Sequence, residues 1–566
     1  MKTLLKNGTV VNVFTDQLEK ADVLLEDNKI IGVGDYQDLD ADLIEDVSGK
    51  YICPGFMDGH IHIESTMMTP EELAKVALLH GTTAIVADPH EIANVCGLDG
   101  IRYMLEASDG LPMNVYIMLS SCVPATALDE SGAVLSSEDL EPMYQLPRVL
   151  GLAEMMNYPG VIAGAPDVLK KLEDARKMGK AIDGHAPLLT GKDLDRYIAE
   201  GIQSDHECSS YKEATERIRK GQWLMIRQGT AARNLDAMLE LFEEPWSRRC
   251  LLVTDDKHPA DLLQDGHIDS IIRRAAEKGK SVLTGIRMAT LQAAQCFGLK
   301  YVGAIAPGYR ADLVVLDDLQ KVLVSDVYCN GKRVVAQGKI QDYAKPAVKE
   351  QLLYKVKNTF HVEHLTAEDF LMEERTGNCR VIRRILGQLL TEEWITAIDW
   401  SKNNGIDTDR DILKLAVIER HKHTGHKGLG LITGCGLKKG AVASSVSHDS
   451  HNLVVLGANE ADMACVANHI MDMGGGIAIA CDGQILASLP LPVAGLMSEL
   501  GAEEIAGQNE ELREVLGSLG VPKDSALLMT MSFVSLAVIP NLKLTTRGLV
   551  DVNHQEFVSL YVEGEV

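Results

Sequence analysis

Two histidines, His60 and His62, stand two residues apart at the end of an apolar run. Alternate residues of a β-strand share one face, so both imidazoles would point the same way, about 6 to 7 Å apart along the strand. Neutral imidazole nitrogens are common ligands of zinc and similar cations, so this pair could hold a metal ion. Two hydrogen-bonded histidines at a strand end would produce the same pattern.

Further ligand-type residues follow other apolar segments, and they favour the metal. They are His90, Glu91, Glu154, His185, His206 and Asp255. Each alone could be turn chemistry or a hydrogen-bonded surface group. Histidines with a bridging carboxylate suit zinc, iron or manganese rather than calcium or magnesium. Two such cations about 3.5 to 4 Å apart can share a hydroxide that is nucleophilic at neutral pH. Asp255 would then take the proton.

The elements that must position these residues alternate between strand-like and helix-like segments from about residue 51 to 299. The strand candidates are 52–62, 83–88, 114–120, 149–154, 180–185, 202–206, 223–228 and 250–255. Such alternation predicts an α/β fold with a closed parallel (β/α)8 barrel of the TIM type. Active sites of these barrels lie at the C-terminal ends of the strands, so the ligand-type residues would converge at the barrel mouth.

The flanks of the barrel predict two further parts. Residues 1–50 and 300–345 contain short strands and turns, and we expect them to form a small flanking β-sandwich in two pieces around the barrel at 51–299. A linker is expected near 345–353, and 346–566 would form an additional C-terminal α+β domain.

Composition narrows the class of protein. The 566 residues are 46% hydrophobic and 24% charged, as in an ordinary globular protein. The net charge of −26 argues against nucleic acid and anionic membrane surfaces as partners. We find no apolar stretch of about 18 residues and no signal-peptide pattern. The 11 cysteines show no C-x-x-C spacing. A cytoplasmic location is therefore expected.

Several longer stretches of the sequence resemble those of a known protein family. Pro54–Met68 (PGFMDGHIHIESTMM), Gly81–Val95 (GTTAIVADPHEIANV) and Ala443–Asn452 (ASSVSHDSHN) resemble the adenine deaminases of bacterial purine metabolism, in the amidohydrolase superfamily. The resemblance covers essentially the whole chain. It implies hydrolytic deamination of adenine to hypoxanthine and ammonia in purine salvage, with a metal-bound hydroxide attacking C6.

The resemblance also implies roles for individual residues. It makes Glu154 the carboxylate that bridges two metal ions, which we expect to be manganese or iron, with zinc as an alternative. The implied ligands are His60, His62, Glu154, His185, His206 and Asp255, the last also shuttling the proton. Relatives that use a carboxylated lysine at this strand are disfavoured, because 149–159 contains no lysine. Ala153 departs from the family pattern, where we expect glycine, without displacing Glu154.

Residues around these ligands receive weaker assignments. Glu64 and Glu91 are candidates for the group that protonates or hydrogen-bonds the purine ring. Together with His90, they could instead support the ligands or hold a further metal. The expected substrate contacts are His90, Ser121, Arg227, His448, Asp449 and His451.

Other functions were weighed against these residues. The chain could act on a related 6-aminopurine or a cyclic amide. It could also be a non-catalytic binding protein with the barrel fold, although every ligand position is filled. Base-flipping zinc deaminases need P-C-x-x-C, which is missing. We expect a small purine as the partner, and a homodimer or homotetramer.

Overall fold

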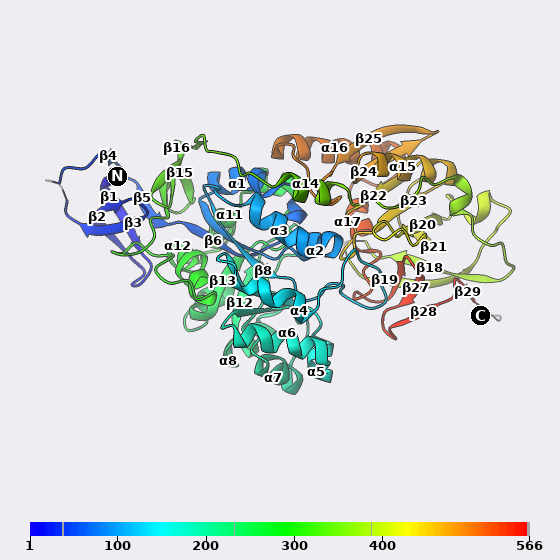
Figure 1. The fold of residues 1–566 in the computed structure, drawn as a ribbon, viewed down its shortest axis with the longest axis horizontal. Coiled ribbons are helices and arrows are strands. Elements are labelled where there is room, and N and C mark those ends of the chain that lie inside the picture. Colours follow the sequence, from blue (N-terminus) through cyan, green and yellow to red (C-terminus); the bar gives the residue numbers. More distant parts are fainter. Residues whose placement is uncertain (37–38, 231, 387, 563–566) are drawn as a thin grey trace. The chain divides into compact units, whose positions relative to one another are not determined.

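The computed structural model describes residues 1–36, 39–230, 232–386 and 388–562. They form two compact units, each with segments from different parts of the chain (Figure 1). The first unit comprises Met1–Pro89, Met104–Ser121 and Ser136–Val348. The second comprises His90–Tyr103, Cys122–Leu135 and Lys349–Val566.

The first unit contains a sheet built from both flanks of the predicted barrel. Its strand order is β17-β16-β15-β14-β5-β1-β2-β3, with β4 on β1. The strands are β1 (Lys2–Asn12), β2 (Gln17–Glu26), β3 (Lys29–Gly34), β4 (Leu43–Asp46), β5 (Tyr51–Pro54), β14 (Leu313–Asp318), β15 (Leu323–Cys329), β16 (Lys332–Ala336) and β17 (Lys339–Ile340). The antiparallel pair β5 and β14 joins the two ends. Apolar side chains of both flanks share one buried core, so the two predicted pieces form a single element.

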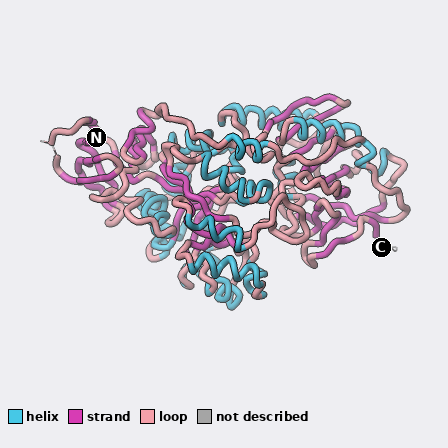
Figure 2. The backbone as a smooth tube through the Cα atoms, viewed as in Figure 1, coloured by secondary structure: helices cyan, strands magenta, loops and turns pink. Residues whose placement is uncertain are grey.

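Parallel strands form two further sheets of the first unit. They form a five-stranded sheet, β10-β9-β8-β7-β6, and a three-stranded sheet, β11-β12-β13. Their bounds are β6 (Phe56–Ile61), β7 (Thr82–Ala87), β8 (Asn114–Leu119), β9 (Val149–Met155), β10 (Ala181–Gly184), β11 (Ser204–Asp205), β12 (Trp223–Arg227) and β13 (Cys250–Val253). A parallel bridge from Ile61 to Asp255 brings the first strand beside the last. The strands therefore curl round. Figure 2 shows the strand segments in magenta among the cyan helices.

Helices alternate with these strands. They include α1 (Pro70–Leu79), α6 (Pro166–Lys177), α7 (Gly191–Ala199), α8 (Tyr211–Arg219), α11 (Ile268–Glu277) and α12 (Val282–Arg287). Apolar faces of several helices pack on the strands: Ile271 and Ile272 of α11 and Ala214 of α8 share a core with Leu224 and Leu252. The alternating pattern of the sequence thus becomes a layer of helices over a parallel sheet.

One local expectation was wrong. The single strand predicted at 52–62 is two strands, because the chain leaves β5 in the flanking sheet at Gly55, whose N–H donates to the carbonyl oxygen of Asp312, and continues as β6 in the parallel sheet. A β-carbon at Gly55 would lie 2.1 Å from Thr83 Oγ1, so only glycine fits there. The linker expected near 345–353 contains the boundary between the two units, at Val348 and Lys349, and its last residues begin helix α14 (Glu350–Lys357), which buries Leu352 and Val356.

The second unit is built on a sheet ordered β19-β18-β21-β20-β23-β22-β24-β25, with β29 on β18. Its strands are β18 (Asn378–Arg384), β19 (Thr391–Ala397), β20 (Leu413–Ile418), β21 (Lys427–Thr433), β22 (Ala441–Ser444), β23 (Leu453–Gly457), β24 (Gly476–Cys481), β25 (Gln484–Pro490) and β29 (Tyr561–Val562). A small sheet adds β26 (Leu542–Thr545), β27 (Gly548–Asp551) and β28 (Glu556–Val558). The helices include α2 (His90–Cys96), α15 (Glu460–Asp472), α16 (Ala502–Ser518) and α17 (Leu527–Phe533). Met463, Val466 and Ile470 of α15 pack on the sheet.

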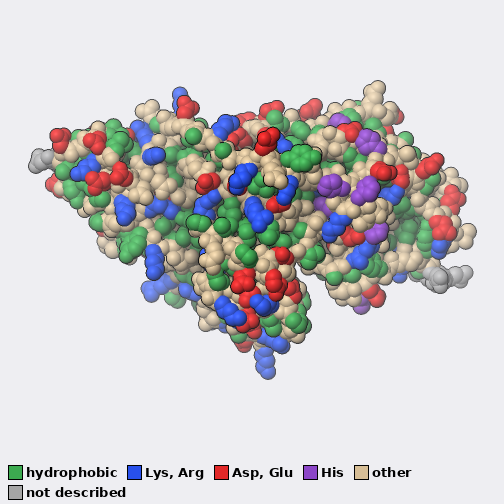
Figure 3. Space-filling model, viewed as in Figure 1, with side chains coloured by type: hydrophobic (Ala, Val, Ile, Leu, Met, Phe, Trp, Pro, Cys, Tyr) green, Lys and Arg blue, Asp and Glu red, His purple; other side chains and the backbone are tan. Residues whose placement is uncertain are grey.

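The visible face carries charged side chains of both signs (Figure 3). Lysine and arginine are interspersed with aspartate and glutamate over the visible face, without one continuous basic patch (Figure 3). Across the described part of the chain, no helix combines the length and the apolar character needed to cross a bilayer.

Candidate metal centre and active site

The histidine pair stands at the C-terminal end of β6, with each ring held through its Nδ1. His60 Nδ1 lies 3.0 Å from Asp183 Oδ2, and His62 Nδ1 lies 3.0 Å from the carbonyl oxygen of Asp88. Both partners are acceptors, so each Nδ1 must donate. In the neutral rings, Nε2 then carries no hydrogen. These two Nε2 atoms lie 3.2 Å apart.

A carboxylate completes this arrangement. Asp255 Oδ1 lies 3.2 Å from Nε2 of His62 and 3.5 Å from Nε2 of His60. Three acceptor atoms that face one another in a buried site require positive charge between them, supplied either by protons or by a metal ion. Burial lowers the pKa of His60, but hydrogen bonds to Asp183 and Asp255 raise that pKa well above its ordinary value. The surroundings therefore favour a cation at this position.

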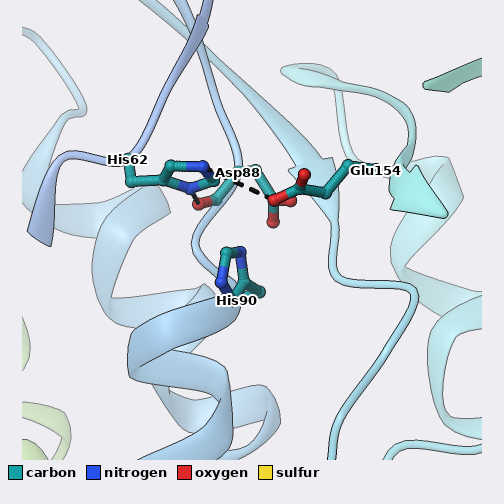
Figure 4. Close-up of side chains that lie close together, drawn as sticks. All are labelled: His62, Asp88, His90 and Glu154. Carbon is teal, nitrogen blue, oxygen red and sulfur yellow. Dashed lines mark hydrogen bonds and ion pairs between the residues drawn. The ribbon is translucent and has the colours of Figure 1, made fainter. Parts of the chain in front are cut away.

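Glu154 lies between this pair and a second pair of histidines. At the end of β9, its Oε1 is 3.5 Å from His62 Nε2, while its Oε2 is 2.6 Å from His185 Nδ1 and 3.2 Å from His206 Nε2. Figure 4 shows the ring of His62 turned toward this carboxylate, with Asp88 beside it. Burial raises the pKa of Glu154, but His185 and His206 hold that pKa well below its usual range. One ionised carboxylate thus faces both histidine pairs.

The second pair follows β10 and β11. His185 Nδ1 lies 3.3 Å from His206 Nε2. The close approach of their strands requires Gly184, where a β-carbon would lie 2.4 Å from the carbonyl oxygen of Ser204. Burial lowers the pKa of His185, but Glu207 and Glu154 raise it to about 9.

Taken together, the structure brings all six sequence-predicted ligands into one buried site. Three overlapping groups each have their ligand atoms within 4.8 Å of one another: His60, His62 and Asp255; His60, Glu154 and His206; and His185, His206 and Glu207. The donor set of imidazoles and carboxylates fits borderline divalent cations such as zinc, iron and manganese. His60 and His206 are shared between groups, so the three groups form one continuous set of ligand-type atoms.

The structure adds residues that the sequence analysis had not assigned. Asp183 and Asp88 fix the rings of the first pair, and Glu207 joins the second pair. Asp183 and Glu207 lie within two residues of a predicted ligand, in the strings D-G-H and D-H-E. Metal-binding imidazoles usually donate their other N–H to a carboxylate or carbonyl, and this was the signal that could have found Asp183.

Other predicted site residues of the first unit have defined surroundings. Arg227, the last residue of β12, donates from Nη1 to Glu207 Oε1 at 2.5 Å and to Asp255 Oδ2 at 2.8 Å. Ser121 Oγ donates to the carbonyl oxygen of Glu154 at 2.5 Å. Glu64 is buried and opens a short 3-10 helix, Glu64–Thr66, just after the histidine pair.

The remaining predicted residues gather in the second unit. Glu91, in α2, has Oε1 3.4 Å from Nδ1 of His448, whose ring stacks on Phe533 with centroids 4.5 Å apart. His451 belongs to the same group of ligand-type atoms. His90 Nε2 lies 4.0 Å from Asp449 Oδ1. The five predicted residues of this unit therefore form one cluster.

His451 has a defined tautomer in that cluster. Its Nδ1 accepts from the backbone N–H of Ser447 at 3.1 Å, so the neutral ring carries its hydrogen on Nε2. Burial, followed by the charge of His448, holds the pKa of His451 well below its ordinary value. It is thus a hydrogen-bond donor at Nε2 rather than a metal ligand.

Comparison with known proteins identifies the class and then the family. Residues 51–335 match the model of the amidohydrolase family. Residues 388–556 match the adenine deaminase C-terminal domain. The first unit therefore has the fold of an amidohydrolase.

Individual relatives are similar over nearly their whole length. An adenine deaminase of Kosmotoga olearia is 45% identical over 99% of this chain and 97% of its own. One of Clostridium acetobutylicum is 44% identical over 98% of this chain and 97% of its own. The chain belongs to the adenine deaminase family. Among solved structures, a β-aspartyl dipeptidase of Fervidobacterium islandicum covers 61% of this chain and 99% of its own, at 18% identity and a TM-score of 0.48.

Proposed function

We propose that the chain is a metal-dependent enzyme that hydrolyses adenine to hypoxanthine and ammonia. The observation that carries the proposal is the pair of Nε2 atoms of His60 and His62, 3.2 Å apart and both facing Asp255. Family membership over the full length supports adenine as the substrate.

The residues proposed to hold two divalent cations divide around Glu154. His60, His62 and Asp255 surround one position, His185 and His206 the other, and Glu154 faces both. When bound, such a pair of cations supplies Lewis-acid polarisation and activates water at neutral pH. Manganese or iron is our choice, with zinc as the alternative.

The chain's own groups are proposed to orient the ligands and carry the protons. Asp183 and the Asp88 carbonyl hold the first two rings with Nε2 toward the reaction centre. Burial raises the pKa of Asp255, but Arg227 and the two imidazoles hold it well below its usual range. The carboxylate is therefore ionised at neutral pH and can accept the proton of the attacking water. Protonation of the purine ring makes C6 more electrophilic, and Glu64 and Glu91 remain our candidates for that step.

Further parts of the proposal follow the sequence. We propose that β6 to β13 close into a complete (β/α)8 barrel, with the boundaries 1–50, 51–299, 300–345 and 346–566. The proposed purine contacts are His90, Ser121, His448, Asp449 and His451, whereas the two carboxylates that Arg227 binds argue against the purine contact expected of it. We also propose a cytoplasmic homodimer or homotetramer.

Ammonia release from a panel of purines tests the function. Enzyme stripped of metal is reloaded with Mn²⁺, Fe²⁺ or Zn²⁺ and offered adenine, other 6-aminopurines and a cyclic amide such as dihydrouracil. We expect adenine to have the highest kcat/KM and the stripped enzyme to be inactive. If another 6-aminopurine were turned over faster, it would take the place of adenine as the proposed substrate. If only the cyclic amide were hydrolysed, the proposed deamination would be wrong.

A further inference from the structure

An arginine lies between two carboxylates of the candidate site, at the ends of three neighbouring strands. β12 is flanked by β11 and β13 in its sheet, and Arg227 is its last residue. Glu207 stands two residues after β11, and Asp255 two residues after β13. Arg227 pairs with Val253 in the register of β12 and β13, so Asp255 lies two residues further along, where the long arginine side chain reaches its carboxylate.

The contacts of Arg227 are short and involve one nitrogen. Nη1 donates to Glu207 Oε1 at 2.5 Å and to Asp255 Oδ2 at 2.8 Å. An Nη atom has two hydrogens in the plane of the guanidinium, so these two bonds use both. Only 15% of the Arg227 side chain and 13% of the Glu207 side chain are exposed. Removing one member of an ion pair this well desolvated leaves a buried charge without its counter-ion, which costs far more than the loss of a surface pair.

The same carboxylates face the histidines. Asp255 turns Oδ2 to the arginine and Oδ1 to Nε2 of His62 and His60. Glu207 Oε1 lies 3.6 Å from His185 Nδ1 and 3.5 Å from His206 Nε2. Any rotation of Arg227 would therefore change which oxygen each imidazole pair meets.

We propose that Glu207, Arg227 and Asp255 form a clamp in which Arg227 is a positioning residue. The guanidinium fixes the rotation of the Asp255 carboxyl, so that Oδ1 stays on the side of His60 and His62. Through Glu207, it connects that side to the pair of His185 and His206. Because Nη1 donates both of its hydrogens to carboxylates, this nitrogen orients the site and does not contact a purine. The inference rests on the proposed function only where turnover is the readout.

Removal of the Arg227 guanidinium should disturb the orientation of the Asp255 carboxylate more than it lowers the affinity for the substrate. Without it, two buried carboxylates lose a shared counter-ion and Asp255 can turn about its side-chain bonds. Displacement of a reacting group by about 1 Å can cost about 10²-fold in rate. Lysine would keep the charge but not the planar fork, so Arg227→Lys should restore only part of the loss.

The test uses Arg227→Gln, Arg227→Lys, Glu207→Gln and the double variant Arg227→Gln/Glu207→Gln. Arg233→Gln is the matched control, because Arg233 lies on the loop after β12 and bonds to the carbonyl oxygens of Gly229 and Thr230. Each protein is loaded with Co²⁺, and its metal content and visible spectrum are recorded. Steady-state kinetics with adenine follow on the manganese-loaded proteins.

The clamp predicts a specific pattern. In Arg227→Gln, metal content is retained, the Co²⁺ bands shift, kcat falls about 10²-fold and KM changes less than about twofold. The double variant resembles Arg227→Gln alone, because the two residues act through one contact. Arg233→Gln matches the wild type in every measurement.

Three results would overturn the clamp. A raised KM with unchanged kcat and spectrum would make Arg227 a substrate contact. Multiplying effects of the two substitutions would make the residues independent. An unchanged Co²⁺ spectrum in Arg227→Gln and Glu207→Gln would remove the clamp altogether. The Co²⁺ spectra need no substrate, so they test the clamp even if the wild-type enzyme does not deaminate adenine. Failure of the wild-type enzyme to deaminate adenine would refute the proposed function but not the clamp.

Discussion

Replacement of Glu154 by Gln is the sharpest perturbation of the candidate site. The carboxylate lies 2.6 Å from His185, 3.2 Å from His206 and 3.5 Å from His62, so one substitution touches both histidine pairs. Glutamine has nearly the same shape but no charge, and one of its two ends donates rather than accepts. Metal binding should therefore weaken at both positions.

The size of the effect follows from burial. Removal of one member of a buried ionic pair costs about 3–5 kcal/mol. At about 1.4 kcal/mol per factor of ten, metal affinity should fall by roughly two to three and a half powers of ten. Folding should survive, because Glu154 contacts side chains of the site rather than the apolar core.

The measurement combines metal content after gel filtration with ammonia release from adenine. We expect Glu154→Gln to lose most of its metal at micromolar Mn²⁺ and nearly all turnover, with an unchanged circular dichroism spectrum. Glu173→Gln, on the exposed face of α6, is the control. Full metal loading with wild-type turnover in Glu154→Gln would remove Glu154 from the reaction and refute its role between the two cations.

Three other predictions concern neighbouring groups. Asp255→Asn should keep much of its metal yet lose turnover at least ~10²-fold, the scale of a lost proton shuttle; loss of both metals with half the activity retained would make Asp255 a ligand only. Asp183→Asn should weaken metal binding about 10- to 100-fold in a Mn²⁺ titration, because Asp183 orients His60; an unchanged Kd would contradict that support. The pKa of His185 is raised from an ordinary 6.5 to about 9, so its charged ring stabilises the metal-free fold. This contribution to the stability is complete below pH 6.5 and is lost as the pH rises through 9. Calorimetry at pH 7.5 should then detect proton release on metal loading, and heats independent of the buffer would count against it.

Much of the first unit could be predicted from local sequence. The expected strands agree with β7, β8, β9, β12 and β13 to within two residues at either end, because apolar runs between helix-like segments have a clear period. The predicted ligands could be found for the same reason. Each lies in the last residues of a strand or just after it, and parallel strands end at one edge of a sheet, so residues far apart in sequence converge.

What could not be predicted depends on contacts between distant segments. No local signal reveals that β5 pairs with β14, some 260 residues away, and so must separate from β6 at Gly55. The clamp partners of Arg227 are set by the order of strands in the sheet. His90 and Glu91 directly follow Asp88-Pro89 in sequence, yet they belong to the second unit with His448 and His451. Their place in the sequence did not reveal that Glu91 would lie with His448 and His451.

Charge balance in the site supports the proposal of two divalent cations. The carboxylates near the imidazole nitrogens include those of Asp183, Glu154, Asp255, Glu207 and Asp88. Arg227 offsets one of these five negative charges and leaves four in a buried site. A single divalent cation cannot offset four charges, whereas two can. In the metal-free protein, protons on the imidazoles take the same role, which is why the pKa values of His60, His62 and His185 are raised. Metals and protons therefore compete for one set of charges, and the count of protons released on loading measures how many cations the site accepts.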